Sequence, residues 1–578
     1  MSFKYNVIGS VGIGNILESI LKNRGIENVN LFLNPTESCC ESELLFDNIE
    51  KARDCFVKHI SNNSKIVIVV DTDVDGNTSA SLMYQYIKRI KPEISIDYVI
   101  HNGKEHGLDN ATMTTIMNSN YNLVIIPDAG SNDYSQLKTL HKSGLDIIIL
   151  DHHLANEYSD NAITVNNQMS NKVTDKAMTG VGIVYKFCKV LDKYYNVSYA
   201  DDYLDLVAVG MIADSCDLRN VQSRYLVNKG LKQIADKNNK NKFMSELINA
   251  QSYSMNNKVT IIGIAFYIAP LINSLIRIGS QDDKTAMFKA FINSDEIVKT
   301  KIRGKGEVEV SIQEYARRLC ESSKRKQKKI VDDNVSLMDA QINQYNLDKL
   351  AIMVCNATDE IDKNYTGLIA NKIASIYQRP CLLLRNNKGY CSGSGRGFDK
   401  SDIKNFNQWC IDTGLFKFAE GHEQAFGCSL IESNVDKLYK VISGIPYSND
   451  LVYDVDAKFN DKTLNKTIME VIAKQDDIWG TTVNEPVFAF ENIIINRSDI
   501  NLMGKTENTI KFTFHNIDFI KFNTNKKEYE DIISLGDSVK FTIIGRCSLN
   551  VYNGTSTVQI LINDMMYEKA MKTNKFRF

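Results

Sequence analysis

The stretch that decides the fold is residues 66–81, IVIVVDTDVDGNTSAS. It opens with five apolar residues, which predict a buried strand, and the residues after Gly76 have the character of a helix. Between the two lie three carboxylates at alternate positions, Asp71, Asp73 and Asp75, and Gly76 is expected to permit the tight turn. Like charges about 4 Å apart repel by about 4 kcal/mol at an effective dielectric of about 20. Three acids at the end of a strand therefore predict a bound cation.

The composition is that of a chain with several independently folded domains. The 578 residues are 43% hydrophobic and 24% charged, with a formal charge of -2, so overall basicity does not indicate a nucleic-acid partner. No apolar run reaches the ~18 residues of a membrane span, and the N-terminus lacks a signal-peptide pattern. The twelve cysteines form no CxxC pair, which favours reduced, mostly buried thiols. We therefore expect a cytoplasmic protein without a membrane partner.

Apolar runs alternate with helical stretches from about residue 65 onward. This alternation predicts an α/β domain with a parallel sheet, in which ligands gather beyond the carboxyl ends of the strands. The expected strands are 66–70, 95–100, 122–127, 145–150 and 162–165.

Further metal-binding side chains follow these strands. Asp128 comes after the third strand, and Asp151, His152 and His153 come after the fourth. Asp214 ends a later apolar run, LDLVAVGMIAD. Carboxylate and imidazole together suit a borderline metal such as Mn²⁺. We therefore predict that all of these acids and histidines converge at one edge of the sheet.

Three kinds of site are compatible with DTDVDG alone. A calcium loop requires a glutamate at its twelfth position, where this chain has Leu82. A haloacid-dehalogenase-like phosphatase would use Asp71 as nucleophile and Asp73 as acid and base, but it does not account for Asp-His-His downstream. A two-metal site uses every acid named above, and it implies hydrolysis of a phosphate ester or anhydride.

The remainder of the chain predicts a multidomain architecture. The region before residue 346 ends in a basic helical stretch, Lys324–Lys329, for which a solvated helix face is the simpler interpretation. The region after residue 445 alternates as strands do, and Asn553-Gly554 indicates a hairpin. We expect a helical lead-in (1–60), the α/β domain (61–235), a helical connector (236–345), a second α/β domain (346–445) and a small β-barrel (446–578).

The ordered motifs resemble the DHH phosphoesterases, and among them the RecJ-like single-stranded-DNA exonucleases, over about residues 60 to 578. The resemblance implies a DHH catalytic domain, a DHH-associated second α/β domain and a C-terminal OB-fold barrel. The motifs that carry it are DTDVDG (71–76), PDAGSND (127–133), DHH (151–153), TGVGIVYKF (179–187), VAVGMIADSCDL (207–218), APLINSLIRIG (269–279), GSGRG (393–397) and GHEQAFG (421–427).

The resemblance also implies a role for each site residue. Asp128, His152, His153 and Asp151 would act in catalysis, with His153 at the scissile phosphate and Asp151 supporting the histidines. One metal ion would be held by Asp71 and Asp73, the other by Asp75, His152 and Asp214, and Asp128 would bridge both. Substrate would be bound by Arg277, Ser394, Gly395, Arg396 and His422, with phosphate contacted by the backbone of a glycine-rich loop at residues 393–397.

The implied activity is 5′-to-3′ hydrolysis of single-stranded DNA to mononucleotides, with two Mn²⁺ or Mg²⁺ ions, in DNA repair and recombination. The implied partners are single-stranded DNA and a single-strand-binding protein or helicase. The arginine that this family carries within residues 99–108 is absent, and His101 and Lys104 are the candidate replacements.

Other functions remain open on the same residues. They are a DHH phosphodiesterase for short oligoribonucleotides or cyclic dinucleotides, a pyrophosphatase, and a non-enzymatic replication scaffold. In the predicted barrel, Phe512, Phe514, Phe519 and Phe522 would either stack on bases or fill the core of a half-buried sheet.

Overall fold

The computed structural model describes residues 3–9, 15–101, 107–236, 240–304, 306–357, 361–446, 451–552 and 555–570. The chain forms two compact units. One comprises residues 25–327 and 477–484, and the other comprises residues 1–24, 328–476 and 485–578. The boundaries of the five domains expected from the sequence stay a prediction.

A five-stranded sheet forms the centre of the first unit. Its order is β3-β2-β4-β5-β6, and every neighbouring pair is parallel. The five strands predicted from apolar runs are therefore confirmed. They are β2 (Ile66–Val70), β3 (Ile96–Ile100), β4 (Leu123–Pro127), β5 (Asp146–Asp151) and β6 (Ile163–Asn166).

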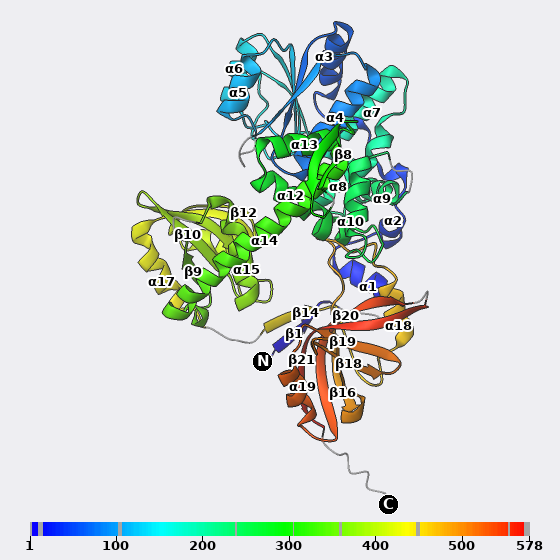
Figure 1. Cartoon of the computed structure of the whole chain (residues 1–578), viewed down its shortest axis with the longest axis vertical. Coiled ribbons are helices and arrows are strands. Elements are labelled where there is room, and N and C mark those ends of the chain that lie inside the picture. The colour runs from blue at the N-terminus through cyan, green and yellow to red at the C-terminus, as the bar shows by residue number, and fades with distance from the viewer. Residues whose placement is uncertain are drawn as a thin grey trace, which may run out of the picture. The chain divides into compact units, whose positions relative to one another are not determined.

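Helices cover both faces of this sheet (Figure 1), so its strands carry apolar residues on both sides. Ile66, Ile68 and Val70 belong to the same core as α3 (Ile49–Ser61), α4 (Val74–Ile90) and α7 (Gly180–Tyr195). Val67 and Val69 belong to the core beneath α5 (Asn110–Met117) and α6 (Tyr134–Lys142). Burial on both faces explains the continuous apolar run of β2.

The rest of the first unit is mainly helical. A hairpin of β7 (Ile297–Ile302) and β8 (Gly306–Ser311) interrupts the region that the sequence predicted to be helical throughout. The helices are α2 (Val29–Leu33), α8 (Leu204–Ala213), α9 (Val221–Ala235), α10 (Lys242–Gln251), α11 (Ile261–Gly263), a π-helical turn at Ile264–Ile268, α12 (Ala269–Ile278), α13 (Gln281–Phe291) and the first half of α14 (Ile312–Tyr345).

One helical stretch, Ile261–Ile278, is long and apolar enough to cross a membrane by length and composition alone. The expectation that no segment reaches that length is therefore wrong for this stretch. More than half of it (56%) is buried within the protein, and Ile264, Ile268, Ile272 and Leu275 belong to the main core of the unit. A helix whose apolar face is buried in this way is typical of a protein core, and it is weak evidence for a membrane span.

A second α/β sheet lies in the other unit. Its order is β12-β13-β11-β10-β9, and all neighbours except β9 and β10 are antiparallel. One face packs against α14 and α15 (Thr366–Tyr377), and the other against α16 (Phe406–Asp412) and α17 (Val435–Ser443). The strands are β9 (Met353–Asn356), β10 (Cys381–Asn387), β11 (Tyr390–Arg396), β12 (Phe416–His422) and β13 (Ala425–Ile431).

The glycine-rich segment GSGRG is not the loop that the sequence predicted. Residues 393–396 belong to β11, which has a partner strand on each side. The glycines allow close packing in this sheet, because a Cβ on Gly393 would lie 1.9 Å from the carbonyl oxygen of Leu383. The backbone N–H groups of a central strand donate to the neighbouring strands. Phosphate binding at this position would therefore depend on side chains.

The C-terminal region forms a seven-stranded sheet in the order β15-β16-β20-β21-β19-β18-β17. The predicted hairpin is confirmed by the pairing of Tyr552 with Thr555, although Asn553-Gly554 itself lies outside the described residues. The strands are β15 (Ala457–Phe459), β16 (Phe488–Asn496), β17 (Asn501–Met503), β18 (Thr509–Phe514), β19 (Ile517–Phe522), β20 (Ser538–Tyr552) and β21 (Thr555–Lys569). Its helices are α18 (Lys466–Ala473) and α19 (Lys526–Ile533).

Two of the four candidate stacking phenylalanines fill the core of this sheet. Phe512 and Phe519 are fully buried, with their rings stacked 5.4 Å apart, so they are not available to bases. Phe522 is 55% exposed, and Phe514 is half-buried against the ring of His515.

The N-terminal segment is not wholly helical. β1 (Phe3–Val7) pairs in parallel with β14 (Leu451–Val455) over five residues, and α1 (Ile16–Asn23) follows it. Arg24 then forms an ion pair with the buried Asp456. Residues 1–24 consequently belong to the same unit as the C-terminal sheet.

Candidate metal centre

The turn between β2 and α4 presents the first three carboxylates. Helix α4 begins at Val74, three residues earlier than predicted, so Gly76 lies in its first turn. Asp73 caps the helix by accepting a hydrogen bond from the backbone N–H of Gly76 at 2.9 Å. The amide of Asn77 donates to the carbonyl oxygens of Asp71 (3.2 Å) and Asp73 (2.7 Å), which holds the turn. Gly76 is needed because a Cβ there would lie 2.6 Å from the Cβ of Asp71.

Asp128 lies at the end of β4 in a left-handed backbone conformation with φ of 63°. Its backbone N–H donates to the carbonyl oxygen of Leu150 at 2.8 Å, so the strained residue is fixed to β5. Its side chain is almost fully buried. Carboxylate oxygens of Asp71, Asp73 and Asp128 lie within 4.8 Å of one another, which is close enough to share a metal ion.

His152 joins the remaining acids. Its Nε2 atom lies 3.2 Å from Oδ1 of Asp128 and 3.6 Å from Oδ2 of Asp214. Ligand atoms of Asp75, His152 and Asp214 form a second group within 4.8 Å. The six residues predicted as metal ligands are therefore brought together by the fold, in two groups that Asp128 and His152 connect.

Asp151 organises the two histidines. Its buried carboxylate accepts hydrogen bonds from the backbone N–H groups of His152 (2.7 Å) and Ser131 (3.1 Å) and from Nδ1 of His153 (2.7 Å). Burial opposes ionisation, but these hydrogen bonds hold the pKa of Asp151 well below its usual value. The bond to Asp151 in turn raises the pKa of His153 to about 9. His153 therefore carries a positive charge at neutral pH when the site contains no metal.

The electrostatics of the site fit divalent cations. Burial and the charge of Asp214 raise the pKa of Asp75, and burial together with Asp75, Asp73 and Asp71 raises that of Asp128 well above its usual value. Asp75 Oδ2 and Asp128 Oδ1 accept no hydrogen bond from the described residues, since the approach of His152 to Asp128 lacks hydrogen-bond geometry. Burial lowers the pKa of His152, which keeps its imidazole neutral and able to bind a metal.

Two glycines that the sequence analysis did not assign to the site shape it. A Cβ on Gly180 would lie 2.3 Å from Oδ1 of Asp128, and a Cβ on Gly210 would lie 2.5 Å from Oδ1 of Asp75. Gly180 is the first residue of α7, whereas Gly210 lies inside α8, where glycine is otherwise unfavourable. For Gly210, its place inside an apolar helical run was the available signal for this close approach.

Cationic side chains occur in the same unit as the acids. Burial lowers the pKa of Arg277, and the charge of Asp73 opposes that shift. Burial and the charge of Arg277 also lower the pKa of Lys324. Arg325 and Lys326 are exposed, as expected for a solvated helix face.

His101 is not available to a substrate. Its ring is buried, with Nδ1 3.2 Å from a carboxylate oxygen of Asp109 and Nε2 against the carbonyl oxygen of Gly107. The backbone N–H of Gly107 donates to Asp71 at 3.1 Å, so His101 braces the metal-binding turn. The other candidate, Lys104, lies outside the described residues.

The remaining predicted substrate residues lie in the other unit. Arg396 ends β11, and its guanidinium donates to the carbonyl oxygen of Gly395 at 2.7 Å. The hydroxyl of Ser394 lies 2.9 Å from that of Thr366, the first residue of α15. A Cβ on Gly367 would lie 2.5 Å from Arg396, so the guanidinium packs on the amino end of that helix. His422 ends β12 and is exposed.

Comparison with known proteins agrees with this arrangement. Residues 65–211 match the DHH family, N-terminal domain, and residues 455–564 match the RecJ OB domain. A prophage-derived protein of Bacillus subtilis (strain 168), named single-strand DNA-specific exonuclease YorK, is 38% identical over 559 residues, which is 95% of each chain. The chain belongs to the RecJ family of DHH-domain proteins.

Solved RecJ structures share the fold. The crystal structure of RecJ from Thermus thermophilus in complex with Mn²⁺ has a TM-score of 0.73 and 16% identity, covering 99% of this chain and 80% of that chain. The corresponding complex with Mg²⁺ has a TM-score of 0.68 and 15% identity, covering 98% and 79%. Manganese and magnesium in these RecJ structures agree with the oxygen-rich donor set described above.

Proposed function

We propose that this protein is a metal-dependent exonuclease that degrades single-stranded DNA from the 5′ end and releases mononucleotides. The observation that carries the proposal is the convergence of Asp71, Asp73, Asp128, His152 and Asp214 with Asp75 at one edge of the parallel sheet. Membership of the RecJ family supports single-stranded DNA as the substrate. The polarity of degradation and the release of mononucleotides are part of the proposal.

The ligand sets follow from the two groups of side chains. Asp71 and Asp73 would hold one ion, Asp75, His152 and Asp214 the other, and Asp128 would contribute to both. Two divalent ions in such a site activate water and stabilise the attacking and leaving oxygens of a phosphodiester displacement. The protein supplies fixed carboxylates in a buried environment, so little reorganisation is needed when the charge of the phosphate changes.

The cationic residues would position the DNA backbone. His153 is held by Asp151 through Nδ1, and its other ring nitrogen would bind the scissile phosphate. Arg277 would contact the strand beside Asp73. In the other unit, Arg396 and Ser394 at the amino end of α15 would bind a phosphate, with His422 and Gly395 nearby in the same sheet.

The OB domain favours long substrates over the short ones of a DHH phosphodiesterase, because such domains track single strands over several nucleotides. We further propose a cytoplasmic role in DNA repair and recombination, with a single-strand-binding protein or helicase as partner. All twelve cysteines are free thiols, and eight of them are buried, as expected of a protein in a reducing compartment.

The test uses single-stranded DNA of about 40 nucleotides, blocked at either the 5′ or the 3′ end, with Mn²⁺, Mg²⁺ or chelator. We expect mononucleotide release from strands with a free 5′ end, in the presence of metal only. Protection by the 3′ block alone would reverse the proposed polarity. Faster hydrolysis of dinucleotides than of long strands would instead identify a phosphodiesterase.

A further inference from the structure

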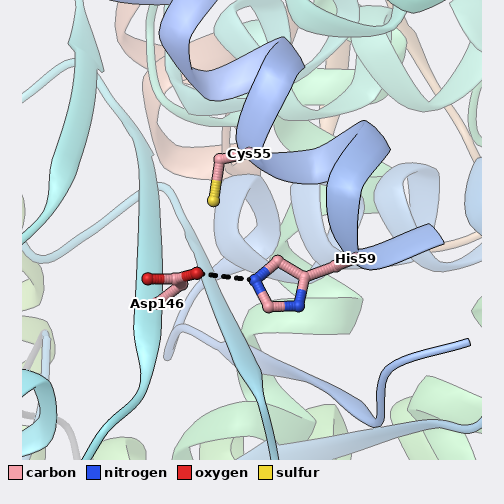
Figure 2. A group of neighbouring side chains, drawn as sticks. All are labelled: Cys55, His59 and Asp146. Carbon is pink, nitrogen blue, oxygen red and sulfur yellow. Dashed lines mark hydrogen bonds and ion pairs between the residues drawn. The ribbon is translucent and has the colours of Figure 1, made fainter. Parts of the chain in front are cut away.

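A second cluster of metal-binding side chains lies at the opposite end of β5. Cys55 and His59 are one turn apart on α3 and therefore share a face of that helix. Asp146 is the first residue of β5. The Cys55 sulfur, a His59 ring nitrogen and an Asp146 carboxylate oxygen all lie within 4.8 Å of one another. Figure 2 shows the sulfur directed toward the gap between the other two groups.

The imidazole of His59 is oriented as in many metal sites. Its ring is buried, with Nδ1 2.9 Å from the hydroxyl of Ser64 and Nε2 2.9 Å from the carboxylate of Asp146. The backbone N–H of Ser64 also donates to the carbonyl oxygen of His59 at 3.0 Å, which fixes Ser64 beside the ring. In many metal sites, a hydrogen bond to one ring nitrogen of a histidine orients the ring so that the other nitrogen binds the metal. Here Ser64 would hold Nδ1, and Nε2 faces the carboxylate and the thiol.

A hydrogen bond between His59 and Asp146 does not by itself explain why the Cys55 thiol lies beside them. The thiol is half-buried, and burial together with the charge of Asp146 raises its pKa to about 11. Lys58 also donates to Asp146 at 2.9 Å, but its side chain is 61% exposed and can turn into solvent. The donor set of sulfur, nitrogen and oxygen differs from the oxygen-rich centre at the other edge, and it is the set that Zn²⁺ prefers.

We propose that Cys55, His59 and Asp146 form a three-ligand site for Zn²⁺ or a similar thiophilic divalent ion, with water as the fourth ligand. On binding, the Cys55 thiol releases its proton to solvent, and the Lys58 ammonium leaves Asp146. One thiolate and one carboxylate then balance the two charges of the ion. The site would tie α3 to the beginning of β5.

The ion at this site would not take part in phosphate hydrolysis. Asp146 and Asp151 are the first and last residues of the six-residue strand β5, about 17 Å apart at the usual rise of an extended chain. The zinc-site proposal would therefore stand even if the proposed exonuclease activity were disproved. The exonuclease proposal would likewise stand if no ion bound at Cys55, His59 and Asp146.

The test is a Co²⁺ titration of the full-length protein after removal of metals with chelator. Tetrahedral cobalt with a thiolate ligand produces a near-ultraviolet charge-transfer band, which ligation by oxygen and nitrogen alone does not. We expect this band in the parent protein and its loss in Cys55→Ser. Cys40→Ser is the matched control, because Cys40 is a half-buried thiol whose pKa burial also raises to about 11, and its band should persist.

A second readout is thermal unfolding in excess Mn²⁺, which occupies the oxygen-rich centre in parent and variant alike, with Zn²⁺ added at about 100 times its dissociation constant for the Cys55–His59–Asp146 site. We expect Tm of the parent to rise by about 3–8 °C, and His59→Gln to lose most of that rise while keeping an amide beside Asp146. Absence of the cobalt band at saturation, or an unchanged band in Cys55→Ser, would overturn the proposal. If Cys55→Ser fails to fold, loss of the band in His59→Gln supports the site and its persistence contradicts it.

Discussion

Strand β5 begins at one candidate metal site and ends at another, and the two sites differ in donors, charge and origin. At its end, Asp151 supports His152 within a cluster of five further aspartates, which come from the turn between β2 and α4, the first turn of α4, and the ends of β4 and α8. At its beginning, Asp146 meets two residues of a single helix face. The first site is formed by residues that follow the carboxyl ends of parallel strands, which is where α/β proteins bind their ligands. The second depends on one helix packing across the opposite edge.

The difference is also electrostatic. Burial and neighbouring carboxylates raise the pKa values of Asp75 and Asp128, so without metal these two carboxyl groups ionise only at a cost in free energy. Burial of Asp146 is offset by hydrogen bonds from Lys58 and His59, which lower its pKa. The ionised carboxylates of the first site therefore require bound cations for stability. Asp146 in the second site already has hydrogen-bond partners in Lys58 and His59. Five experiments can sharpen or break this contrast.

The largest effect is expected from Asp128→Ala or His152→Ala. Asp128→Ala removes the proposed ligand of both ions and His152→Ala removes a ligand of one of them, so hydrolysis of single-stranded DNA should fall by at least about 10²–10³-fold. The fold should persist, which circular dichroism would verify. Asp54→Asn changes an exposed carboxylate on α3 and should retain full activity. Retained activity in both site variants would break the assignment of the first site.

Gly180→Ala should reduce activity by about 100-fold without removing any ligand. The added methyl group would overlap Asp128 Oδ1, and displacement of a reacting geometry by about 1 Å can cost that much. Steady-state kinetics and a Mn²⁺ titration would measure the effect. At Gly444 an added Cβ meets its nearest atom at 3.4 Å, so Gly444→Ala serves as the control. Equal activity of the two variants would contradict the close approach.

Asp151→Asn should reduce activity by about 10–100-fold, as is usual for residues that orient a metal-site histidine. Because the bond to Asp151 is the main cause of the raised pKa of His153, that pKa should fall from about 9 toward its ordinary value of 6.5. An NMR titration of the metal-free protein would follow the His153 ring. Asp54→Asn, which changes an exposed carboxylate on α3, should leave the pKa of His153 unchanged.

The metal-free protein should lose stability with rising pH through its buried acids. Asp75 and Asp128 bind protons more tightly in the folded than in the unfolded chain, so their contribution is full below about pH 3.9. That contribution is lost as the pH rises through their folded-state pKa values. Tm of Asp128→Asn should therefore exceed that of the parent by a margin that grows from pH 4 upward. A margin independent of pH would show that the carboxylates are compensated without metal.

The smallest effect is expected from Lys58→Met. Removing the exposed ammonium that shares Asp146 should tighten Zn²⁺ binding at the Cys55–His59–Asp146 site by less than about fivefold, because exposed ion pairs are weak. A competition titration with a chromophoric chelator would measure the change. Weaker zinc binding in this variant would indicate that Lys58 supports the site rather than competes for it.

The convergence of the acids and histidines at the first site could be predicted because its signals are local. Each acid follows an apolar run, so Asp71, Asp128 and Asp151 could be placed at strand ends without a structure. The close approach of Gly180 and Gly210 to those acids could not be placed, since it depends on how helices α7 and α8 pack.

Other features depend on partners that are distant in the sequence. GSGRG has the composition of a loop, yet tight packing between β10 and β13 makes it a central strand. Phe512 and Phe519 alternate as half-buried residues do, but alternation does not show which face is buried. Cys55 and His59 have the spacing of a helix face, while their third partner lies about 90 residues later in a strand that no local pattern connects to them.

The pairing of β1 with β14 has a consequence for synthesis on the ribosome. β1 is made before its partner β14, which follows roughly 450 residues later, and at 5–20 residues per second this is a delay of roughly 20–90 s. During that interval the nascent strand presents an unpaired edge while the intervening α/β domain has time to fold. Peptides fused ahead of Phe3 would therefore affect the maturation of the C-terminal sheet before any effect on the DHH domain.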